Sequence, residues 1–310
     1  MDRNGKIIGN NNDLYFDDIN YYNKNLYLVR LNDKYSFIDK NGDLINNGDS
    51  WFDYADTYCT NGFGVVKLNG EYSFIDENGN LINNGNSWFD EVDDFNGNFA
   101  AVRLNDKYSF IDKNGELINS GNLWLDSVIS FYYNFFKVQL NDKYSLFNNV
   151  IGELIGNGNL WFDSIDGFKY NFSQVKLNDK YSLLNKNGEL IGNGNLWFTY
   201  INPFNDEYDS TVVCNMYGGI PKFSLITKNG VLVKGGNLWL DVISLSFEDG
   251  LALSMVNNKK YYIDTKGNFY DYETKQPIPS PIDNNKNESK KKIKNLIKET
   301  INNYLKSNLI

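Results

Sequence analysis

Aspartate is the residue type of this chain whose spacing first suggests chemistry. Two carboxylates that flank a glycosidic bond can hydrolyse it. The most regular acids here, however, follow an aromatic or apolar pair in five copies: Asp53, Asp90, Asp126, Asp163 and Asp241. A catalytic pair is needed once, whereas an acid repeated in most copies of a unit is typical of a structural position. The sequence therefore predicts no catalytic residue, and we expect a protein that is not an enzyme.

Histidine and cysteine offer little further chemistry. The chain has no histidine, the side chain most often used as a general base and metal ligand near neutral pH. Its two cysteines, Cys59 and Cys214, form no CxxC motif and have no histidine to activate them. The segment Asp39–Asp43 resembles the start of a calcium loop, but the further oxygen ligands of an EF-hand do not follow it. We expect no cofactor and no metal.

Net charge separates most of the chain from its C-terminal end. The whole chain carries −9, and because residues 281–310 hold seven lysines and three acids (+4), residues 1–280 carry −13. Such an acidic body argues against nucleic-acid binding. The sequence contains no run of about 18 apolar residues and no apolar core of signal-peptide length at its start. We expect no transmembrane segment, and a location in a bacterial cytoplasm or a virion.

An internal repeat supplies the elements that must position these residues. The segment Leu31–Gly42 returns nearly unchanged at Leu104–Gly115. Weaker copies begin at Leu68, Leu140, Leu177, Met216 and Met255. A turn glycine recurs every 36–37 residues, apart from one 42-residue step in the sixth copy, at Gly5, Gly42, Gly79, Gly115, Gly152, Gly188, Gly230 and Gly267. This period indicates a repeat architecture of seven degenerate units.

Each unit has the pattern of short strands without a helix. In the third copy, Asn98–Leu104 alternates between apolar and polar residues, Asn105-Asp106 is a turn signal, and Lys107–Asp112 is the returning strand. A second turn then ends in Gly115, where a left-handed backbone suits glycine. Three or four strands of this length cannot bury an apolar face alone, so neighbouring units must stack. The sequence predicts an all-β repeat protein.

The repeated unit resembles the WG repeat family of bacterial proteins. The resemblance rests on the hairpin [ND][DG]-[KE]-Y-S-F-I-D-x-N-G-x-L-I and the aromatic-Asp segment behind it, and it covers residues 1–272. The family's aromatic-glycine pair is replaced by Tyr-Ser here, as in Tyr108-Ser109, so a role tied to that glycine does not carry over. The resemblance implies a repeat scaffold and no fixed activity, cofactor or ligand. Lys259–Gly267 also looks like a choline- or glucan-binding cell-wall repeat, but the roughly 20-residue period of those repeats does not match.

Two sets of periodic side chains are candidates for binding. The tryptophans take one position per unit, where they either anchor each unit in the core or form a ladder that stacks on sugar rings; they are Trp51, Trp88, Trp124, Trp161, Trp197 and Trp239. We favour the core. A surface row of mostly basic residues could meet an acidic partner or simply face solvent; it comprises Arg30, Lys67, Arg103, Gln139 and Lys176.

The pattern changes after Tyr272. Residues 1–272 are predicted to form the repeat domain, residues 273–288 a polar linker, and residues 289–310 an amphipathic helix. One face of this helix would carry partner-binding residues, namely Ile293, Leu296, Ile297, Ile301, Tyr304 and Leu305. The opposite face carries lysines that could alternatively meet a membrane surface.

The count of units suggests how they assemble. The chain starts in the middle of a unit at Asp2–Ile8, and the last copy ends just past Gly267. The N-terminal segment would therefore complete the last unit and close a seven-bladed propeller-like ring, with an open β-solenoid of stacked hairpins as the alternative. We expect a scaffold that binds a protein through its repeats or its C-terminal helix. The alternative is a carbohydrate-binding module that uses exposed aromatics between repeats, and the oligomeric state is left open.

Overall fold

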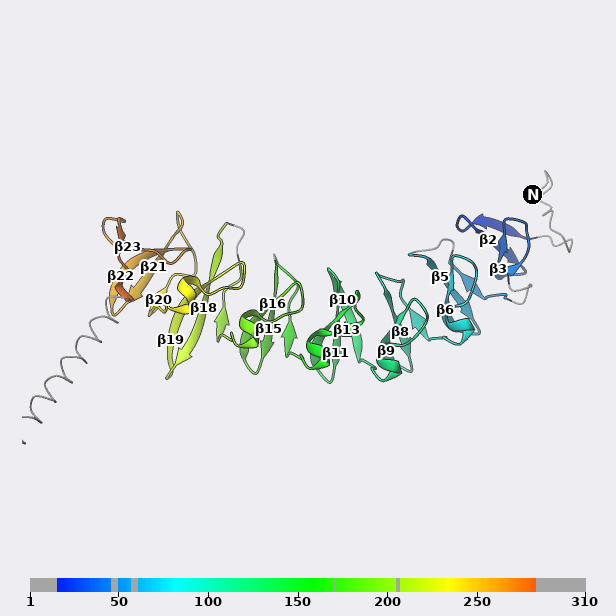
Figure 1. Cartoon of the computed structure of the whole chain (residues 1–310), viewed down its shortest axis with the longest axis horizontal. Helices are drawn as coiled ribbons and strands as arrows, with labels where there is room; N and C mark the ends of the chain where they lie inside the picture. Colours follow the sequence, from blue (N-terminus) through cyan, green and yellow to red (C-terminus); the bar gives the residue numbers. More distant parts are fainter. Residues whose placement is uncertain (1–15, 46–49, 57–60, 170, 205–206, 283–310) are drawn as a thin grey trace, which may run out of the picture. The chain divides into compact units, whose positions relative to one another are not determined.

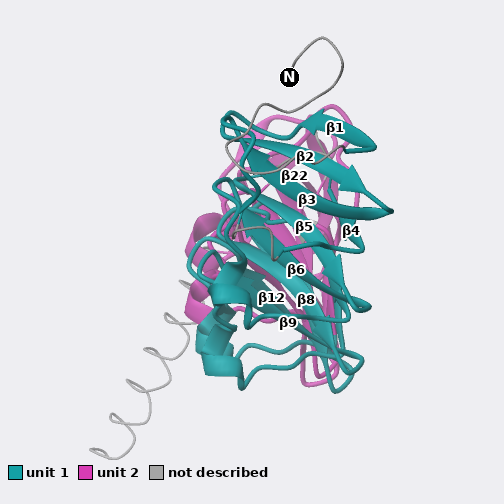
Figure 2. Ribbon diagram, turned by 90° about the vertical axis from the view of Figure 1, so that its right-hand side faces the viewer, with its two compact units in different colours: residues 1–163 teal, residues 164–310 magenta. Residues whose placement is uncertain are grey.

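A computed structural model describes residues 16–45, 50–56, 61–169, 171–204 and 207–282 (Figure 1). The chain divides into two compact units, Met1–Asp163 and Ser164–Ile310 (Figure 2). The predicted helix 289–310 and its six proposed partner-binding residues lie outside the described residues, as does the segment Asp2–Ile8. In both units the described residues form small antiparallel sheets, which confirms the all-β repeat fold.

Unit 1 contains four sheets within its described residues. The first three sheets have three strands each: β1 (Asp18–Tyr21), β2 (Leu26–Leu31) and β3 (Lys34–Asp39); β4 (Tyr54–Ala55), β5 (Phe63–Leu68) and β6 (Glu71–Asp76); β7 (Glu91–Val92), β8 (Phe99–Leu104) and β9 (Lys107–Asp112). The fourth has β10 (Ser127–Tyr132), β11 (Phe135–Leu140), β12 (Lys143–Asn148) and β13 (Glu153–Leu154). Three short 3-10 turns follow the hairpins: η2 (Ile82–Gly85), η3 (Ile118–Gly121) and η4 (Ile155–Gly158).

Unit 2 continues the same plan with three described sheets. Two have three strands: β14 (Ser164–Ile165), β15 (Phe172–Leu177) and β16 (Lys180–Asn185); β17 (Tyr200–Ile201), β18 (Ser210–Tyr217) and β19 (Ile220–Thr227). The last has β20 (Val242–Ile243), β21 (Leu251–Val256), β22 (Lys259–Asp264), β23 (Phe269–Asp271) and β24 (Pro277–Ile278). The turns η5 (Ile191–Gly194) and η6 (Val233–Gly236) complete the unit.

Two-residue turns close the seven described hairpins, as the sequence predicts. In the third repeat, Asn105 has φ 51° and Asp106 has φ 61°. Asn69 and Gly70 of the second repeat have φ 53° and 93°. Two successive left-handed residues match the right-handed twist of the strands they connect, and Asn, Asp and Gly tolerate that conformation best. The hairpin register therefore follows from local turn chemistry.

Within each unit, a crossing segment joins one hairpin to the next. It consists of the apolar residue behind the tryptophan, the residue after it (in most copies Asp) and the short strand that follows. Leu125 exchanges two backbone hydrogen bonds with Tyr108 of the third hairpin, at 2.8 and 3.0 Å. The next residue, Asp126, donates its backbone N–H to the carbonyl of Gln139 in the fourth hairpin, at 2.9 Å. Adjacent residues of one segment thus bond to two different repeats.

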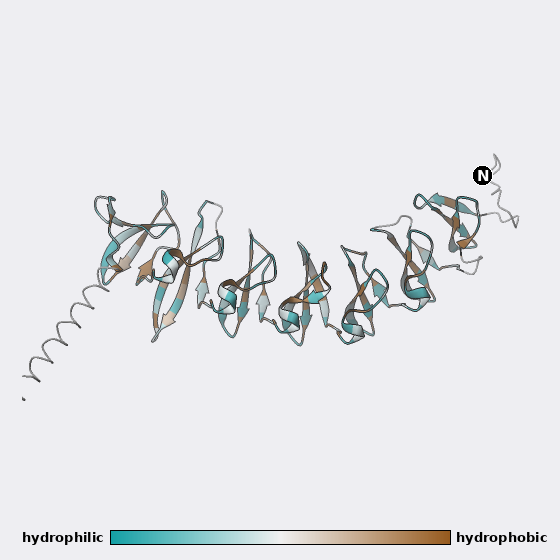
Figure 3. Cartoon of the chain, viewed as in Figure 1, coloured by the Kyte–Doolittle hydropathy of each residue, from teal (hydrophilic) through white to brown (hydrophobic). Residues whose placement is uncertain are grey.

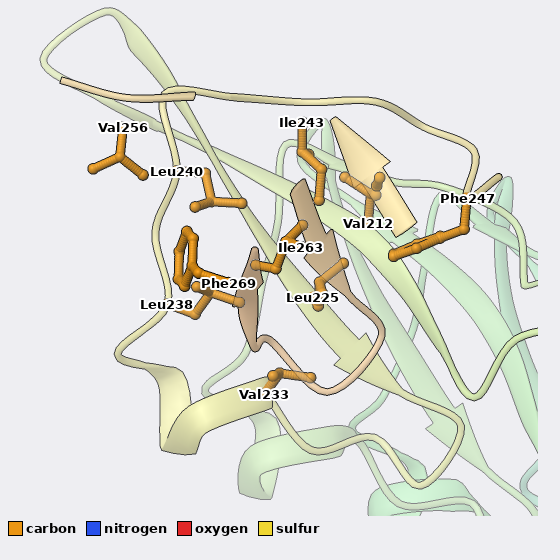
Figure 4. Packing of buried hydrophobic residues seen from close by; sticks show 11 residues of the cluster. Val212, Leu225, Val233, Leu238, Leu240, Ile243, Phe247, Val256, Ile263 and Phe269 are labelled. Atoms are coloured by element: carbon orange, nitrogen blue, oxygen red, sulfur yellow. The ribbon is translucent and has the colours of Figure 1, made fainter. Parts of the chain in front are cut away.

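The hydrophobic core lies between consecutive repeats. Each of the five large buried clusters draws its members from two neighbouring repeats, as in the set that joins Phe110 and Leu125 of the third repeat to Val138 and Phe147 of the fourth. In unit 2, Leu225 and Ile263 lie next to each other in the last such cluster (Figure 4). Apolar residues gather on the strands, and the turns are mostly hydrophilic (Figure 3). Stacking therefore buries what a single repeat cannot.

The end of the repeat region differs from the expected polar linker. Residues 273–282 form a turn and strand β24, whose Ile278 pairs with Phe269 of β23. Ile278 and Ile282 also pack against the last apolar cluster, where no seventh tryptophan segment follows to cover it. The linker assignment therefore does not hold for 273–282, because these residues finish the last repeat.

Replacing a turn glycine with alanine should destabilise the fold by an amount that depends on how close the preceding repeat lies. A Cβ on Gly115 would lie 2.8 Å from Ile82 Cγ1 and 2.8 Å from Asn83 Cβ of the preceding repeat, and Gly115 has φ +83°. Gly70 has a similar φ of +93°, but nothing lies within 4 Å of its added Cβ. We expect Gly70→Ala to cost about 1–2 kcal/mol from backbone strain and Gly115→Ala about 1–3 kcal/mol more from overpacking.

Urea unfolding of both variants measures this difference. Equal losses for Gly70→Ala and Gly115→Ala would show that the glycine contact between repeats carries no packing energy.

Candidate functional site

The periodic aspartates hold neighbouring hairpins together. Asp126 Oδ1 accepts a hydrogen bond from Lys107 Nζ of the third hairpin at 2.6 Å, and its Oδ2 accepts the backbone N–H of Asn141 in the fourth hairpin turn at 2.7 Å. The equivalent turn amides of other repeats donate to Asp53, Asp90 and Asp241. A lysine also pairs with Asp53, Asp163 and Asp241. These contacts support the structural reading of the periodic acids.

The same contacts lower the pKa values of three of these aspartates. The hydrogen bond from Lys107, followed by that from the Asn141 amide, lowers the pKa of Asp126. The pKa values of Asp53 and Asp241 are likewise lowered, mainly by Lys34 and Lys222. A carboxylate that accepts bonds from a cation and an amide is favoured in its charged form. These acids are therefore held ionised, which suits a clamp and does not suit a proton donor.

A buried serine in five of the described hairpins makes a hydrogen bond that the sequence did not predict. Ser109 is fully buried, and its hydroxyl donates to the carbonyl of Leu123 at 2.8 Å, just before the tryptophan. The equivalent hydroxyls of Ser36, Ser73, Ser145 and Ser182 make the same bond at 2.6–2.7 Å. Where the WG family has glycine, this chain thus gains a hydrogen bond. Its recurrence behind tyrosine was the available signal.

The tryptophans contribute to the core from its edge. All six are half-buried, whereas the residue after each is at most 3% exposed. The Trp124 indole N–H donates to the carbonyl of Gly121 at 2.9 Å, and the same bond recurs at Trp88, Trp161, Trp197 and Trp239. The expected core role is thus correct only in part, because the deepest side chain is the apolar residue that follows.

The predicted basic row consists of residues paired within their own sheets. Arg103 bonds to Glu91 and, at 2.9 Å, to Asp106. Lys67 donates to the Tyr72 hydroxyl at 3.1 Å and lies 4.5 Å from the centre of its ring. Arg30 lies 3.9 Å from Asp33, and Lys176 lies 2.9 Å from Asp179. Local pairing therefore accounts for these cations, and the structure adds no support for an acidic ligand at the row.

Other reactive groups do not converge on a site. Burial raises the pKa of the Cys214 thiol, which disfavours the thiolate; Cys59 lies outside the described residues. Desolvation, then Asp94 and Glu91, raise the pKa of Asp93, an acid that the sequence analysis did not single out. Among described residues, no group of three or more His, Cys, Asp or Glu could hold a metal ion. Over the same part of the chain, no helix is long and apolar enough to cross a membrane.

Some of the exposed aliphatic and aromatic residues lie where the repeat pattern is broken. The fourth repeat has Val150 and Ile151 in the turn after its hairpin, 51% and 63% exposed. Ile151, Leu123 and Trp161 line a cavity of about 700 Å³ between the third and fourth repeats. The sixth repeat has eight-residue strands and an exposed tip with Met216, Tyr217 and Ile220. Both places deviate from the periodic sequence and form the candidate interaction surfaces.

The described residues form small sheets of three to five strands, and crossing segments with a repeated Asp join them. This arrangement defines a tandem-repeat all-β protein. Three of the repeats match the family described as "WG containing repeat", at residues 13–35, 89–108 and 162–181. The resemblance to WG repeats seen in the sequence is thus confirmed at these three positions. No curated protein matches the chain.

Several solved structures show a distant likeness. Hsv2 from Kluyveromyces lactis is 10% identical, with 84% of this chain and 97% of that chain covered and a TM-score of 0.28. Virginiamycin B lyase from Staphylococcus aureus is 11% identical, with 84% and 94% covered and a TM-score of 0.23. A eukaryotic initiation factor is 8% identical, with 87% and 88% covered and a TM-score of 0.28. At these scores the likeness carries no inference about function.

The buried serines allow a matched prediction. Ser109→Ala leaves the carbonyl of Leu123 without its donor, and we expect a loss of about 1–3 kcal/mol. Ser224 occupies the same position in the sixth repeat, but its buried hydroxyl has no hydrogen-bond partner. Ser224→Ala should therefore be neutral or slightly stabilising. Urea unfolding compares the two, and a larger loss for Ser224→Ala than for Ser109→Ala would contradict the assignment.

The lowered pKa values predict acid sensitivity. A carboxyl whose folded pKa lies below its unfolded value of about 3.9 stabilises the fold above that value, and this stability is lost as the pH falls through the folded pKa. Asp126→Asn should lower the melting temperature at pH 7 and narrow its difference from the parent below about pH 4. Melting curves between pH 2 and 7 test this. A difference that stays constant over the range would rule out a contribution from the Asp126 charge.

Proposed function

We propose that this protein is a non-enzymatic repeat scaffold that binds another protein through the residues that depart from the repeat pattern. The observation that carries the proposal is that periodic and non-periodic side chains have different roles. The periodic Asp, Ser and Trp side chains bond within and between repeats, whereas large apolar side chains are exposed at the insertions of the fourth and sixth repeats. Exposed apolar patches on a folded domain mark interaction sites.

The tip of the sixth hairpin is the stronger of these features for a foreign partner. Met216, Tyr217 and Ile220 are 48%, 53% and 61% exposed. Gly218 and Gly219 form the turn between them, with open space around both. Met and Tyr are enriched at protein interfaces. Tyr217 rests edge-on against Trp239 at 5.5 Å between ring centres, which holds its ring in place.

The carbohydrate alternative uses exposed aromatics between repeats, and a ladder of tryptophans is one form of it. The described tryptophans are half-buried, and five of them use their indole N–H on a glycine carbonyl. This supports the protein partner over a sugar ladder. As a proposed location we keep a bacterial cytoplasm or a virion, which fractionation of the native source tests.

The partner proposal predicts the effect of one double variant. Met216→Asp with Ile220→Asp should weaken partner binding more than about tenfold, since buried anchor residues dominate interfaces. Leu245→Asp, at a residue 51% exposed in the same unit, is the matched control. The partner is first identified by cross-linking in the native source, and calorimetry with the purified partner gives the dissociation constants. Equal affinities for parent and double variant would refute this surface, and binding only to a glycan array would favour the carbohydrate reading.

Closure of the seven units into a ring stays a prediction. The ring was predicted because the N-terminal segment would supply the strands that the last repeat lacks. The last sheet instead contains β23 and β24, which follow β22 directly, and this weakens the argument for closure. A compact ring of 310 residues should have a radius of gyration of about 20 Å. Small-angle scattering measures this quantity, and a clearly larger value would favour the open solenoid of stacked hairpins.

A further inference from the structure

The turn of the fourth repeat is built differently from its equivalents. The third repeat turns through the four residues Asp112–Gly115, whereas the fourth uses five, Asn148–Gly152. The corresponding turns elsewhere present residues such as Lys40-Asn41 or Glu77-Asn78 before the glycine, but the fourth presents Val150 and Ile151. A hydrophilic turn has thus become an aliphatic one in a single repeat.

The extra residue fixes this turn against the third repeat. Asn149 is 2% exposed, and its Nδ2 donates to the carbonyl of Asn96 at 2.7 Å. In return, Asn98 Nδ2 donates to the carbonyl of Val150 at 3.1 Å. The backbone N–H of Val150 bonds to Asn148 Oδ1 at 2.9 Å. The turn is therefore held in one position while its two aliphatic side chains face solvent.

A groove continues from this turn. The cavity of about 700 Å³ beside Ile151 is lined by Leu123 and Trp161 and carries the acid Glu153. It lies entirely between the third and fourth repeats, within unit 1. A groove that combines aliphatic and aromatic side chains with polar groups and one acid suits a ligand segment that carries both aliphatic side chains and positive charge.

We propose that this groove binds the C-terminal tail, residues 289–310, of a second copy of this chain. The tail sequence places Ile293, Ile297, Ile301 and Leu305 at intervals of four residues, a spacing that would align them on one side of a helix. Residues 281–310 carry +4 against −13 for the rest of the chain. The aliphatic side chains of the tail thus match Leu123, Ile151 and Trp161 of the groove, and its lysines match Glu153 and the acidic charge of residues 1–280.

The inference rests on the proposed function, since it names a partner for a repeat surface and for the predicted helix. The partner named here is a second copy of this chain, whereas the proposed function concerns a different protein. Each copy carries this tail and this groove, so two copies can fill both sites in a reciprocal dimer.

The test is the oligomeric state of the full chain, measured by sedimentation across a dilution series. We expect a dimer that dissociates on dilution. Ile151→Asp and, in the tail, Ile297→Asp should each raise the dissociation constant at least about tenfold. Val231→Asp, at the equivalent turn of the sixth repeat and 59% exposed, should leave it unchanged. An excess of synthetic peptide 289–310 should compete with dimer formation.

A monomer throughout the series, or a dimer that Ile151→Asp leaves intact, overturns the inference. Melting curves confirm that each variant is folded, and Val150→Asp replaces Ile151→Asp if that variant is not. Binding of the foreign partner by Ile151→Asp is measured in parallel. Loss of the dimer by Ile151→Asp with unchanged foreign binding is the expected result. Foreign binding by a parent chain that is monomeric throughout overturns this inference alone, whereas loss of binding through the sixth hairpin concerns the proposed function.

Discussion

The crossing segment is the feature on which the remaining structure depends, because two adjacent residues serve two repeats at once. Leu125 bonds its backbone to the third hairpin and buries its side chain between repeats, while Asp126 bonds its backbone to the fourth hairpin. The Asp126 carboxylate then joins Lys107 to the turn amide of Asn141. Sheet pairing, core packing and charge pairing therefore share one register. A shift of one residue would exchange the buried and clamping roles.

Much of this architecture was accessible from the sequence because its determinants are local. The turn residues Asn105 and Asp106 require left-handed backbone, which fixes the hairpin. The recurrence of an acid in five copies predicted a structural position, which the bonds of Asp126 to Lys107 and Asn141 support. Periodicity also located the tryptophans, but it could not separate Trp124 from Leu125, since both are apolar and adjacent. Their burial depends on the neighbouring repeat.

Other features could not be read from local pattern. The bond from Ser109 to the carbonyl of Leu123 spans 14 residues, and serine alone does not announce its acceptor. The prolines and polar residues after Tyr272 suggested a linker, yet Ile278 and Ile282 cover an apolar end that exists only once the repeats have stacked. The candidate surface of the fourth repeat was equally hidden, because Val150 and Ile151 resemble core residues until the structure places them in an exposed turn.

The short sequence separation between Asp126 and its two bonding partners has a consequence for folding during synthesis of the chain. Lys107 precedes Asp126 by 19 residues, and Asn141 follows it by 15. Each junction can therefore close as soon as the next hairpin leaves the ribosome, without waiting for distant sequence. Because contacts between nearby residues lower the entropic barrier to folding, the nascent chain can add one repeat at a time. The exposed apolar end then moves along the chain until residues 277–282 cover it.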